Sequence, residues 1–315
     1  MQARNLSLAL SNSSSSGERV AHSITPAELR EQALKGTPQE RAEFVRTITV
    51  PHPQFAEGLN ILEETLSRSS IPDPGGVRIV GASGLGKSFI CRHFLQKHPT
   101  IIGDDSVSIP VLFIQLEASL SGLDLVRRLL VALGFPFSQG QNRVDLSDLV
   151  SEGMRTRNVQ FLLIDEAQEF AEGRGESRAS VIGNTLKRIY DNTDIPQGFL
   201  GTPLLDRFFH ICDQLASRIS AEHRLVPFEF DATFYGVLDA FDEALPLERR
   251  SFLSERYAHP IYQCTKGNMR ALRRLLSAAV LAASIENASA LRKTDLIAAF
   301  RQVFGTGSHP FVKRR

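Results

Sequence analysis

Cysteine and long apolar runs are scarce in this sequence. The three cysteines, Cys91, Cys212 and Cys264, are odd in number and far apart, and no CxxC pair occurs. This argues against a disulfide framework and a cysteine-built zinc site, and it favours a reducing compartment. No segment approaches the roughly 18 consecutive apolar residues that a membrane span needs. The first thirty residues hold Ser and Asn where a secretory signal needs an apolar stretch, so we expect a cytoplasmic protein without a membrane partner.

The remaining composition is that of a globular protein with an uneven charge. Of 315 residues, 42% are hydrophobic and 23% charged, which excludes a largely disordered or fibrous chain and suggests about two domains. The net charge is +1, yet residues 249–315 hold thirteen Lys and Arg against three acids, a balance of about +10. Such a region attracts a phosphate backbone, although solvated helix faces and a basic tail would give the same count.

The residue pattern divides the chain into five segments. Residues 1–25 are rich in Ser and Asn and predict a disordered tail. Residues 26–75 predict a helical lead-in, with a helix start at Thr25–Glu28 and a second helix over Phe55–Leu66. Residues 76–230 alternate strands with helices, residues 231–305 have a helical pattern, and residues 306–315 form a basic tail.

The alternating segment predicts an α/β domain with a parallel sheet. Expected strands are Val77–Val80, Val111–Leu116, Phe161–Ile164, Phe199–Gly201 and Leu225–Phe230, and expected helices are Lys87–Lys97 and Leu123–Leu133. The continuous apolar run Phe161–Ile164 is typical of a strand covered on both faces.

A phosphate-binding loop follows the first expected strand. The motif GxxxxGK[ST] is complete and opens a helix, which is the context that this loop requires. Its residues are Gly81, Ala82, Ser83, Gly84, Leu85, Gly86, Lys87 and Ser88. Backbone N–H groups of such a loop converge on phosphate oxygens, while Lys87 reaches the β- and γ-phosphates and Ser88 holds Mg²⁺. The alternative is a glycine-rich turn with a chance Lys-Ser pair.

Two acids end the strand Phe161–Ile164. Asp165 falls at the carboxyl edge of the sheet, where it helps to hold Mg²⁺. Glu166 supplies a second carboxylate that polarises a water for attack on the γ-phosphate. A surface Asp-Glu pair at a strand end is the alternative, but together with the phosphate-binding loop the two acids predict an ATP-hydrolysing site.

Three residues further along are candidates for the same site. Thr202 ends a strand, where its hydroxyl either reaches the γ-phosphate or the attacking water, or only caps the helix that starts at Pro203. Arg218 precedes the last strand, where it either meets the nucleotide of a neighbouring subunit or is an ordinary surface arginine. Arg270 begins a helix and can fold back onto the phosphates. Arg273 and Arg274, one turn on, are either solvated or face a ligand, and the default expectation is that they are solvated.

This ordered set of motifs, GASGLGKS, LLIDEAQ, a later GT, SRI and GNMR, resembles the AAA+ ATPases. The segment around GNMR resembles the initiator and clamp-loader branch. From about residue 28 to 300 the chain is similar to the TniB/TnsC group of transposition regulators, including the stretches Ile195–Pro203 and Gln214–Arg218. The resemblance implies an αβα sandwich with a parallel sheet, followed by a small helical lid.

The resemblance also implies roles for single residues. Lys87 and Ser88 bind the triphosphate and Mg²⁺, Asp165 completes the metal site and Glu166 activates water. Thr202 resembles the first sensor, where many relatives have asparagine, Arg218 resembles the arginine finger, and Arg270 the second sensor.

The resemblance implies a protein that oligomerises with ATP, like the members of this group, as rings or helical filaments around duplex DNA. They mark a target site and recruit the transposase together with a target-selection protein, and hydrolysis drives disassembly. Three regions are candidates for DNA contact: a loop between the first core strands, the stretch Arg174–Arg178, and the basic lid.

Two other functions stay open on the residues alone. The first is a nucleotide-gated scaffold that binds protein instead of DNA, with the basic C-terminus only a solvated surface or a dock for an acidic partner. The second is a P-loop kinase, which is disfavoured because the acid pair and Arg218 point to water as the nucleophile and no acceptor-binding segment is evident.

Overall fold

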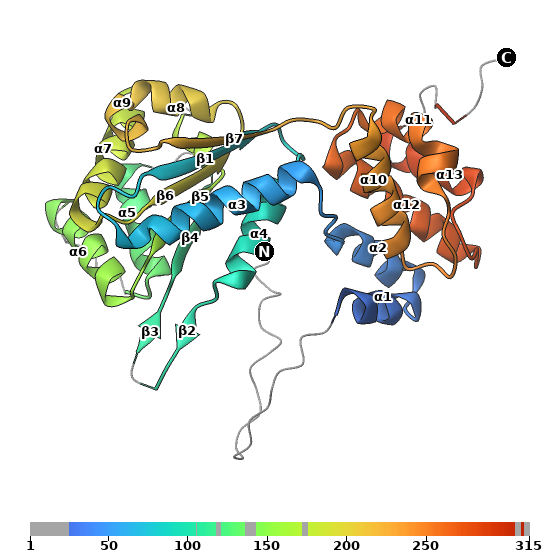
Figure 1. Ribbon diagram of the computed structural model, residues 1–315, viewed down its shortest axis with the longest axis horizontal. Coiled ribbons are helices and arrows are strands. Elements are labelled where there is room, and N and C mark those ends of the chain that lie inside the picture. The colour runs from blue at the N-terminus through green and yellow to red at the C-terminus, as the bar shows by residue number, and fades with distance from the viewer. Residues whose placement is uncertain are drawn as a thin grey trace.

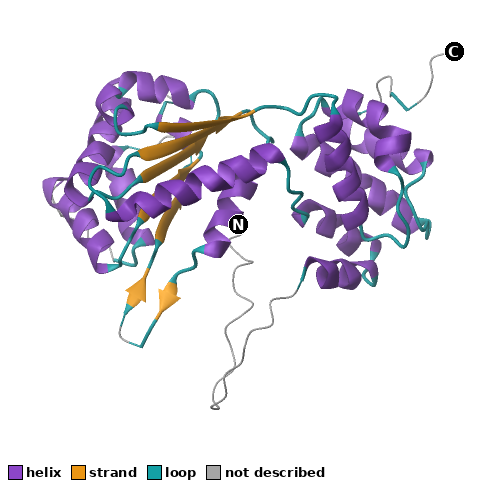
Figure 2. Cartoon of the chain, in the orientation of Figure 1, coloured by secondary structure: helices purple, strands orange, loops and turns teal. Residues whose placement is uncertain are grey.

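A sheet-containing core and a group of helices beside it make up the molecule (Figures 1 and 2). The computed structural model describes residues 25–104, 106–117, 121–135, 143–171, 176–305 and 310–311. Both expected tails therefore lie almost wholly outside the described residues. Within these ranges the three cysteines are unpaired, and no helix is both long and apolar enough to cross a membrane.

The core sheet has five parallel strands in the order β4-β5-β6-β1-β7. Their bounds are β1 Gly76–Gly81, β4 Val111–Gln115, β5 Phe161–Asp165, β6 Gln197–Gly201 and β7 Ala221–Leu225. Because all five run the same way, the ends of β1, β5 and β6 meet at one edge of the sheet. This places the loop after Gly81, the acids at Asp165 and Glu166, and Thr202 at that edge.

Helices cover both faces of the sheet, as the apolar run in β5 predicts. Leu162 and Ile164 pack into one hydrophobic cluster, while Phe161 and Leu163 pack into another on the opposite face, and all four are fully buried. In Figure 1, α3 and α4 lie on one face and α5 to α9 on the other. The covering helices are α3 Pro53–Ser67, α4 Lys87–Lys97, α5 Gly122–Ala132, α6 Arg143–Thr156, α7 Glu176–Thr193, α8 Leu205–Ile211 and α9 Asp213–Ala216, with 3₁₀ turns η1 Arg68–Ser70 and η2 Ala167–Phe170.

One predicted strand is wrong. The apolar alternation at Leu225–Phe230 indicated the last strand, but β7 occupies Ala221–Leu225, earlier in the chain. The strand lies at the edge of the sheet, so its residues need little hydrophobicity, and Glu222 and Arg224 are exposed. The apolar residues that follow lie in the connection to the helical group, where Phe228 is buried.

The helical group forms the lid and draws on both ends of the described chain. Its helices are α1 Pro26–Leu34, α2 Pro38–Thr47, α10 Ala232–Ala244, α11 Leu253–Thr265, α12 Met269–Ile285 and α13 Lys293–Phe304. The predicted helix start is confirmed, since Thr25 and Glu28 form a capping box. α2 packs along α12, where the Ser277 hydroxyl donates to the Ala42 carbonyl at 2.7 Å. The helical lead-in is therefore shared. α2 packs against α12, and Arg30 of α1 donates to the Leu245 and Leu247 carbonyls, whereas α3 packs on the sheet.

The two chain segments that join core and lid meet at His52 and Phe228. His52 caps α3, and its ring lies 4.8 Å from that of Phe228, centroid to centroid. Phe228 in turn donates its backbone N–H to the Gly267 carbonyl. Gly267 has φ +70, and a Cβ there would collide with the Phe228 carbonyl oxygen, so only glycine permits this approach.

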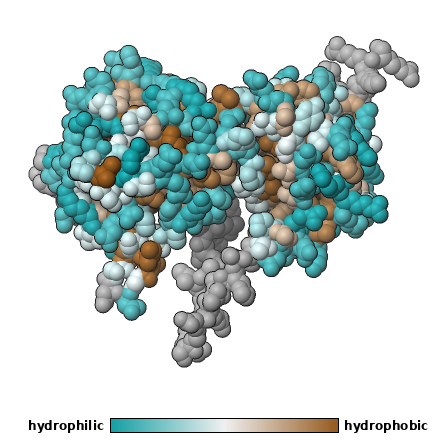
Figure 3. Space-filling view, in the orientation of Figure 1, coloured by the Kyte–Doolittle hydropathy of each residue, from teal (hydrophilic) through white to brown (hydrophobic). Residues whose placement is uncertain are grey.

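A two-stranded hairpin projects from the core between α4 and β4 (Figure 1). It pairs β2 Ile101–Ile102 with β3 Val107–Ser108 in antiparallel fashion. Ile101 and Ile102 are 60% and 78% exposed, and Figure 3 shows hydrophobic colour on this projection. Its sequence carries Asp104 and Asp105 but no Lys or Arg between residues 99 and 110.

Candidate nucleotide-binding site

The phosphate-binding loop connects β1 to α4 with two glycines in left-handed conformations. Gly84 has φ +87 and Gly86 has φ +113, which favour glycine because a Cβ would strain either backbone. Gly84 also needs the space: a Cβ there would lie 2.7 Å from the Asn268 carboxamide oxygen. Helix α4 begins at Lys87, so its N-terminal N–H groups open toward the same loop.

Lys87 folds back beneath its own loop. Its ammonium donates to the carbonyl oxygens of Gly81 at 2.5 Å and Ala82 at 3.2 Å, and the residue is buried. Burial lowers the pKa of Lys87, while the nearby carboxylates of Glu166 and Asp165 oppose this shift. The ammonium therefore lies at the base of the loop, where it is hydrogen-bonded to neutral carbonyls that a phosphate oxygen can replace.

The two acids at the end of β5 occupy different environments. Asp165 is buried, and burial raises its pKa, although the Glu166 backbone N–H donates to its carboxylate at 2.8 Å and the Ser88 hydroxyl bonds to it. Glu166 has φ +55 and its side chain lines the open pocket. The Gln168 carboxamide donates to its carboxylate at 2.6 Å.

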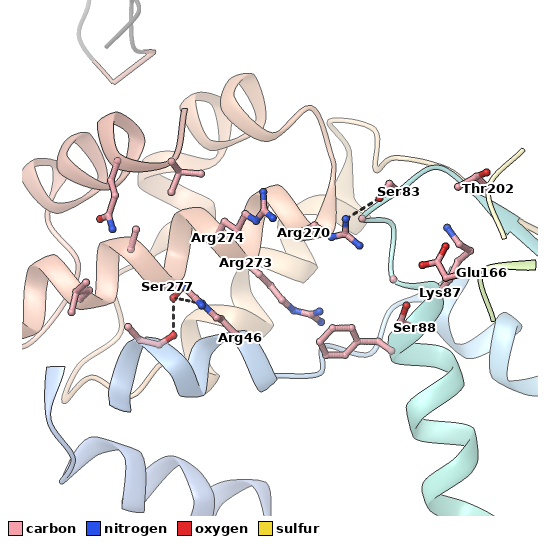
Figure 4. Close-up of a pocket in the computed structure, with 18 residues that line it drawn as sticks. Arg46, Ser83, Lys87, Ser88, Glu166, Thr202, Arg270, Arg273, Arg274 and Ser277 are labelled. Carbon is pink, nitrogen blue, oxygen red and sulfur yellow. Dashed lines mark hydrogen bonds between the residues drawn. The ribbon is translucent and has the colours of Figure 1, made fainter. Parts of the chain in front are cut away.

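The start of lid helix α12 is docked onto the phosphate-binding loop. The Asn268 side chain caps α12 and donates to the Ser83 carbonyl at 3.0 Å. The Arg270 backbone N–H donates to the Gly84 carbonyl at 2.9 Å, and its guanidinium donates to the Ser83 hydroxyl at 2.8 Å (Figure 4). Arg270 thus lies against the loop, as the lid motif predicted.

Between loop and lid lies a pocket of about 630 Å³ (Figure 4). Thr202 and Glu166 line one end, and residues of α2, α12 and α13 line the other. Among the described residues that line it, one is acidic, Glu166, and five are cationic; the cationic residues are Arg46, Lys87, Arg270, Arg273 and Arg274. This excess of positive charge in a concave site suits a polyanion such as a nucleotide triphosphate.

The expectation that Arg273 is solvated is wrong. Its side chain is buried, its guanidinium carbon lies 3.4 Å from the ring centroid of Phe89, and no described residue accepts a hydrogen bond from its Nε. Burial, assisted by the charge of Arg92, lowers the pKa of Arg273 to about 10. Arg274 is exposed, although it lines the pocket.

Sequence reasoning also missed Arg46, whose Nε donates to the Ser277 hydroxyl at 3.3 Å. In the sequence, Arg46 and Arg273 are simply basic residues on two separate helices. They come together at the pocket because α2 packs along α12.

Arg218 lies away from its own pocket. It precedes β7 at the edge of the sheet where the strands begin, and it pairs with Asp191 at 3.4 Å. Its carbonyl oxygen is 3.8 Å from where a Cβ of Gly75 would lie, just before β1 starts. The five-residue strands span about 16 Å, so this end is remote from the phosphate-binding loop.

Of the expected DNA-contacting regions, Arg174 lies outside the described residues, and Arg178 lies on α7. In the lid, Arg250 pairs with acids on α10, and Arg292 pairs with Glu286 and Asp295. Exposed basic residues with no ion pair to another described residue remain on the lid; they are Lys35, Arg46, Arg249, Arg256, Lys266, Arg270, Arg274, Lys293 and Arg301.

The comparisons with known proteins agree with this geometry. A family model described as "Bacterial TniB protein" matches residues 41–229, more than half of the chain. A search of curated proteins finds no match.

Among solved structures, Cdc6p from Pyrobaculum aerophilum is similar with 17% identity and a TM-score of 0.60, over 83% of this chain and 70% of that one. The ORC2 protein of Aeropyrum pernix, in ADPNP-ADP complexes, has 13% identity and a TM-score of 0.59, over 84% and 72%. The ORC1 protein of Aeropyrum pernix, in complex with DNA, has 15% identity and a TM-score of 0.59, over 83% and 69%.

At these identities the likeness shows a shared fold, a parallel αβα sandwich followed by a helical lid. The family match covers the phosphate-binding loop, the acid pair, Thr202 and Arg218. The chain therefore belongs to the TniB family, and its fold is that of the AAA+ ATPases.

Proposed function

We propose that the protein binds and hydrolyses ATP in this pocket and uses the cycle to regulate DNA transposition, assembling on duplex DNA and marking a target site for a transposase. The observation that carries the first part is the convergence of Lys87, Ser88, Asp165 and Glu166 at one sheet edge beneath a lid. Membership of the TniB family supports the second part.

Lys87 and Arg270 bind the triphosphate. The Lys87 ammonium exchanges the carbonyls of Gly81 and Ala82 for phosphate oxygens, and Arg270 exchanges the Ser83 hydroxyl for the γ-phosphate. Since the lid contacts the loop through Asn268 and Arg270, nucleotide binding and lid position are coupled.

Ser88 and Asp165 suit Mg²⁺. A hydroxyl and a carboxylate are hard oxygen ligands, and they are already in contact with each other. In nucleotide sites this ion is held by one or two protein ligands together with the phosphates, which is the number of ligands that these two residues supply. When bound, Mg²⁺ neutralises charge on the phosphate oxygens.

Glu166 acts as the general base. Its carboxylate lines the pocket and accepts a proton from the water that attacks the γ-phosphate. Thr202 lies at the same end of the pocket, where its hydroxyl contacts the γ-phosphate or that water. Replacing Glu166 with glutamine keeps the shape and removes the base. We expect Glu166→Gln to bind ATP but to stay in the assembled, ATP-bound state; rapid turnover by this variant contradicts the assignment.

Arg218 serves a neighbouring subunit. Its position near the beginnings of the strands keeps it from its own nucleotide, whereas a second copy stacked in a ring or filament can receive it. The Asp191 carboxylate holds Arg218 in the free chain and is exchanged for the neighbour's phosphate on assembly.

The unpaired basic residues of the lid are the favoured DNA contact. The projecting hairpin is a poor one, because it carries acids and no Lys or Arg. Lys293 and Arg301 on α13 are exposed and have no acid paired with them among the described residues. Removing one cation that binds a DNA phosphate lowers the slope of log K against log salt by about 0.9.

The Lys293→Gln, Arg301→Gln double variant therefore lowers this slope by up to about 1.8. The control is Arg155→Gln, Arg207→Gln on the core, which removes the same charge from exposed sites. Equal slopes for the two double variants contradict a lid contact.

Electron microscopy tests the proposal as a whole. The protein is imaged with duplex DNA in the presence of a slowly hydrolysed ATP analogue or of ADP. Rings or filaments on DNA with the triphosphate alone support it. Assembly that is the same with and without DNA favours a protein-binding scaffold. The exposed Ile101 and Ile102 of the hairpin are a candidate contact for its partner. A salt titration separates the two, because only phosphate binding weakens steeply with salt.

A further inference from the structure

A buried amide side chain beside the pocket has no part in the steps above. Gln168 lies in η2, directly after the acid pair, and is 5% exposed. Its Nε2 donates to Glu166 Oε2 at 2.6 Å, and its Oε1 accepts the backbone N–H of Thr202 at 3.0 Å. Because that N–H can only donate, the carboxamide oxygen must face Thr202, which leaves the NH₂ group to face the carboxylate.

The surroundings hold this amide in one place. Ala167 and Phe170, in the same turn, are 0% and 3% exposed. Gly201 makes room for it, since a Cβ there would lie 2.9 Å from the Gln168 carboxamide oxygen. Glu166 itself has a left-handed backbone, φ +55, at the point where the chain turns from β5 into η2.

The amide thereby joins two functional positions from neighbouring strands. Glu166 follows β5 and Thr202 follows β6, and Figure 4 shows both at one end of the pocket. A hydrogen bond to an ionised carboxylate is short and directional, so it decides which oxygen of Glu166 is free to meet a water. The second hydrogen bond fixes the amide to the backbone of Thr202, whose hydroxyl, in the proposed function, contacts the terminal phosphate or the attacking water.

We propose that Gln168 is a positioning residue that aims the Glu166 carboxylate at the attacking water and couples this aim to the Thr202 backbone. The inference rests on the proposed ATPase function. When Thr202 moves against the terminal phosphate, the amide carries the carboxylate with it, so the base is aligned only when a triphosphate is bound. ADP lacks that phosphate and leaves the base unaligned.

Two substitutions test this. Gln168→Leu removes both hydrogen bonds at similar volume, and we expect kcat for ATP to fall about ten- to hundredfold, as for loss of a hydrogen bond to a charged group, while the Kd for ATP changes less than about threefold. Gln168→Glu keeps the size and the acceptor for Thr202 but places a second carboxylate against Glu166. At pH 8 its kcat should fall at least as far.

Lowering the pH distinguishes positioning from a structural role. A protonated carboxyl at this position donates again. Below about pH 6 the kcat of Gln168→Glu, relative to wild type at the same pH, should therefore recover about fivefold or more, whereas the ratio for Gln168→Leu should stay constant. Because Gln168→Glu is nearly isosteric, it keeps the test open if Gln168→Leu does not fold.

Gln197 supplies a matched control. It is a second fully buried glutamine, at the start of β6, and its amide donates to the Leu186 carbonyl at 2.9 Å. Gln197→Leu should lower the melting temperature without lowering kcat. Unchanged kcat in Gln168→Leu, or a constant ratio for Gln168→Glu across the pH range, overturns the inference. If Glu166→Gln hydrolyses ATP normally, the proposed base itself fails, whatever Gln168 does.

Discussion

Arg273 is a buried cation with no ion pair to another described residue, and replacing it with methionine should change the stability of the free protein and ATP binding in opposite directions. The side chain is 9% exposed, and its guanidinium carbon lies 3.4 Å from the Phe89 centroid and 5.9 Å from that of Phe241. It lines the pocket in which we propose that ATP binds. We expect Arg273→Met to stabilise the nucleotide-free protein and to weaken ATP binding.

The magnitude follows from the environment of the charge. Burial lowers the pKa of Arg273 from 12.5 to about 10, so at neutral pH, where the side chain is still charged, burying the charge costs about 3 kcal/mol. Stacking on Phe89 returns about 2 kcal/mol. The methionine sulfur keeps contact with the rings, worth about 1 kcal/mol. The substitution should therefore stabilise the free protein by about 2 kcal/mol, or roughly 4–8 °C in Tm.

ATP binding should move in the opposite direction. Loss of a charge-assisted contact of about 1.5–3 kcal/mol weakens the Kd for ATP by about ten- to hundredfold. Thermal unfolding without nucleotide and calorimetric titration with ATP measure the two effects. Arg274→Met, an exposed neighbour that lines the same pocket, is the control and should not stabilise the free protein. Loss of stability in Arg273→Met, or wild-type ATP affinity, refutes the reasoning.

Three further predictions concern single side chains. Lys87→Ala should abolish ATP binding in calorimetry while the free protein still folds, because the hydrogen bonds of its ammonium to described residues all go to loop carbonyls; normal binding contradicts this. Arg218→Ala should bind ATP but not hydrolyse it, and mixing it with Lys87→Ala should restore some activity if the arginine acts on a neighbouring subunit; no recovery argues against that. Burial, and to a lesser extent the charge of Arg273, lowers the pKa of His52 from its usual 6.5 to about 4. The ring therefore binds fewer protons in the folded protein than in the unfolded one, and the free energy of unfolding falls as the pH drops from about 6.5 to 4. In urea titrations across this range, His52→Asn, which retains a helix cap, should reduce the pH-dependent change in the free energy of unfolding by about 1–2 kcal/mol, a value that allows for solvent screening of the partly exposed ring. If the free energy of unfolding depends on pH as it does in the wild type, the assignment to His52 is contradicted.

The sequence was most informative where a motif consists of residues that are neighbours in the chain. The phosphate-binding loop and the acid pair each consist of neighbouring residues whose backbone path follows from glycine freedom and strand burial, so both were predicted in place. The last strand was misplaced because β7 lies at the sheet edge and is partly polar, whereas the apolar residues after it serve the lid. A hydrophobic pattern predicts that residues are buried, but it does not predict which element of the fold buries them.

By itself, therefore, the sequence determined the fold class, the place of the glycine-rich loop between β1 and α4, and the acid pair at the end of β5, because these depend on short-range chemistry. Only the tertiary structure decided which distant residues complete the pocket. Arg46 and Arg273 meet there because α2 packs along α12, more than two hundred residues later in the chain. Gln168 reaches Thr202 because β5 and β6 are neighbours in the sheet. Such contacts depend on the packing of whole elements, which no single segment of the chain encodes.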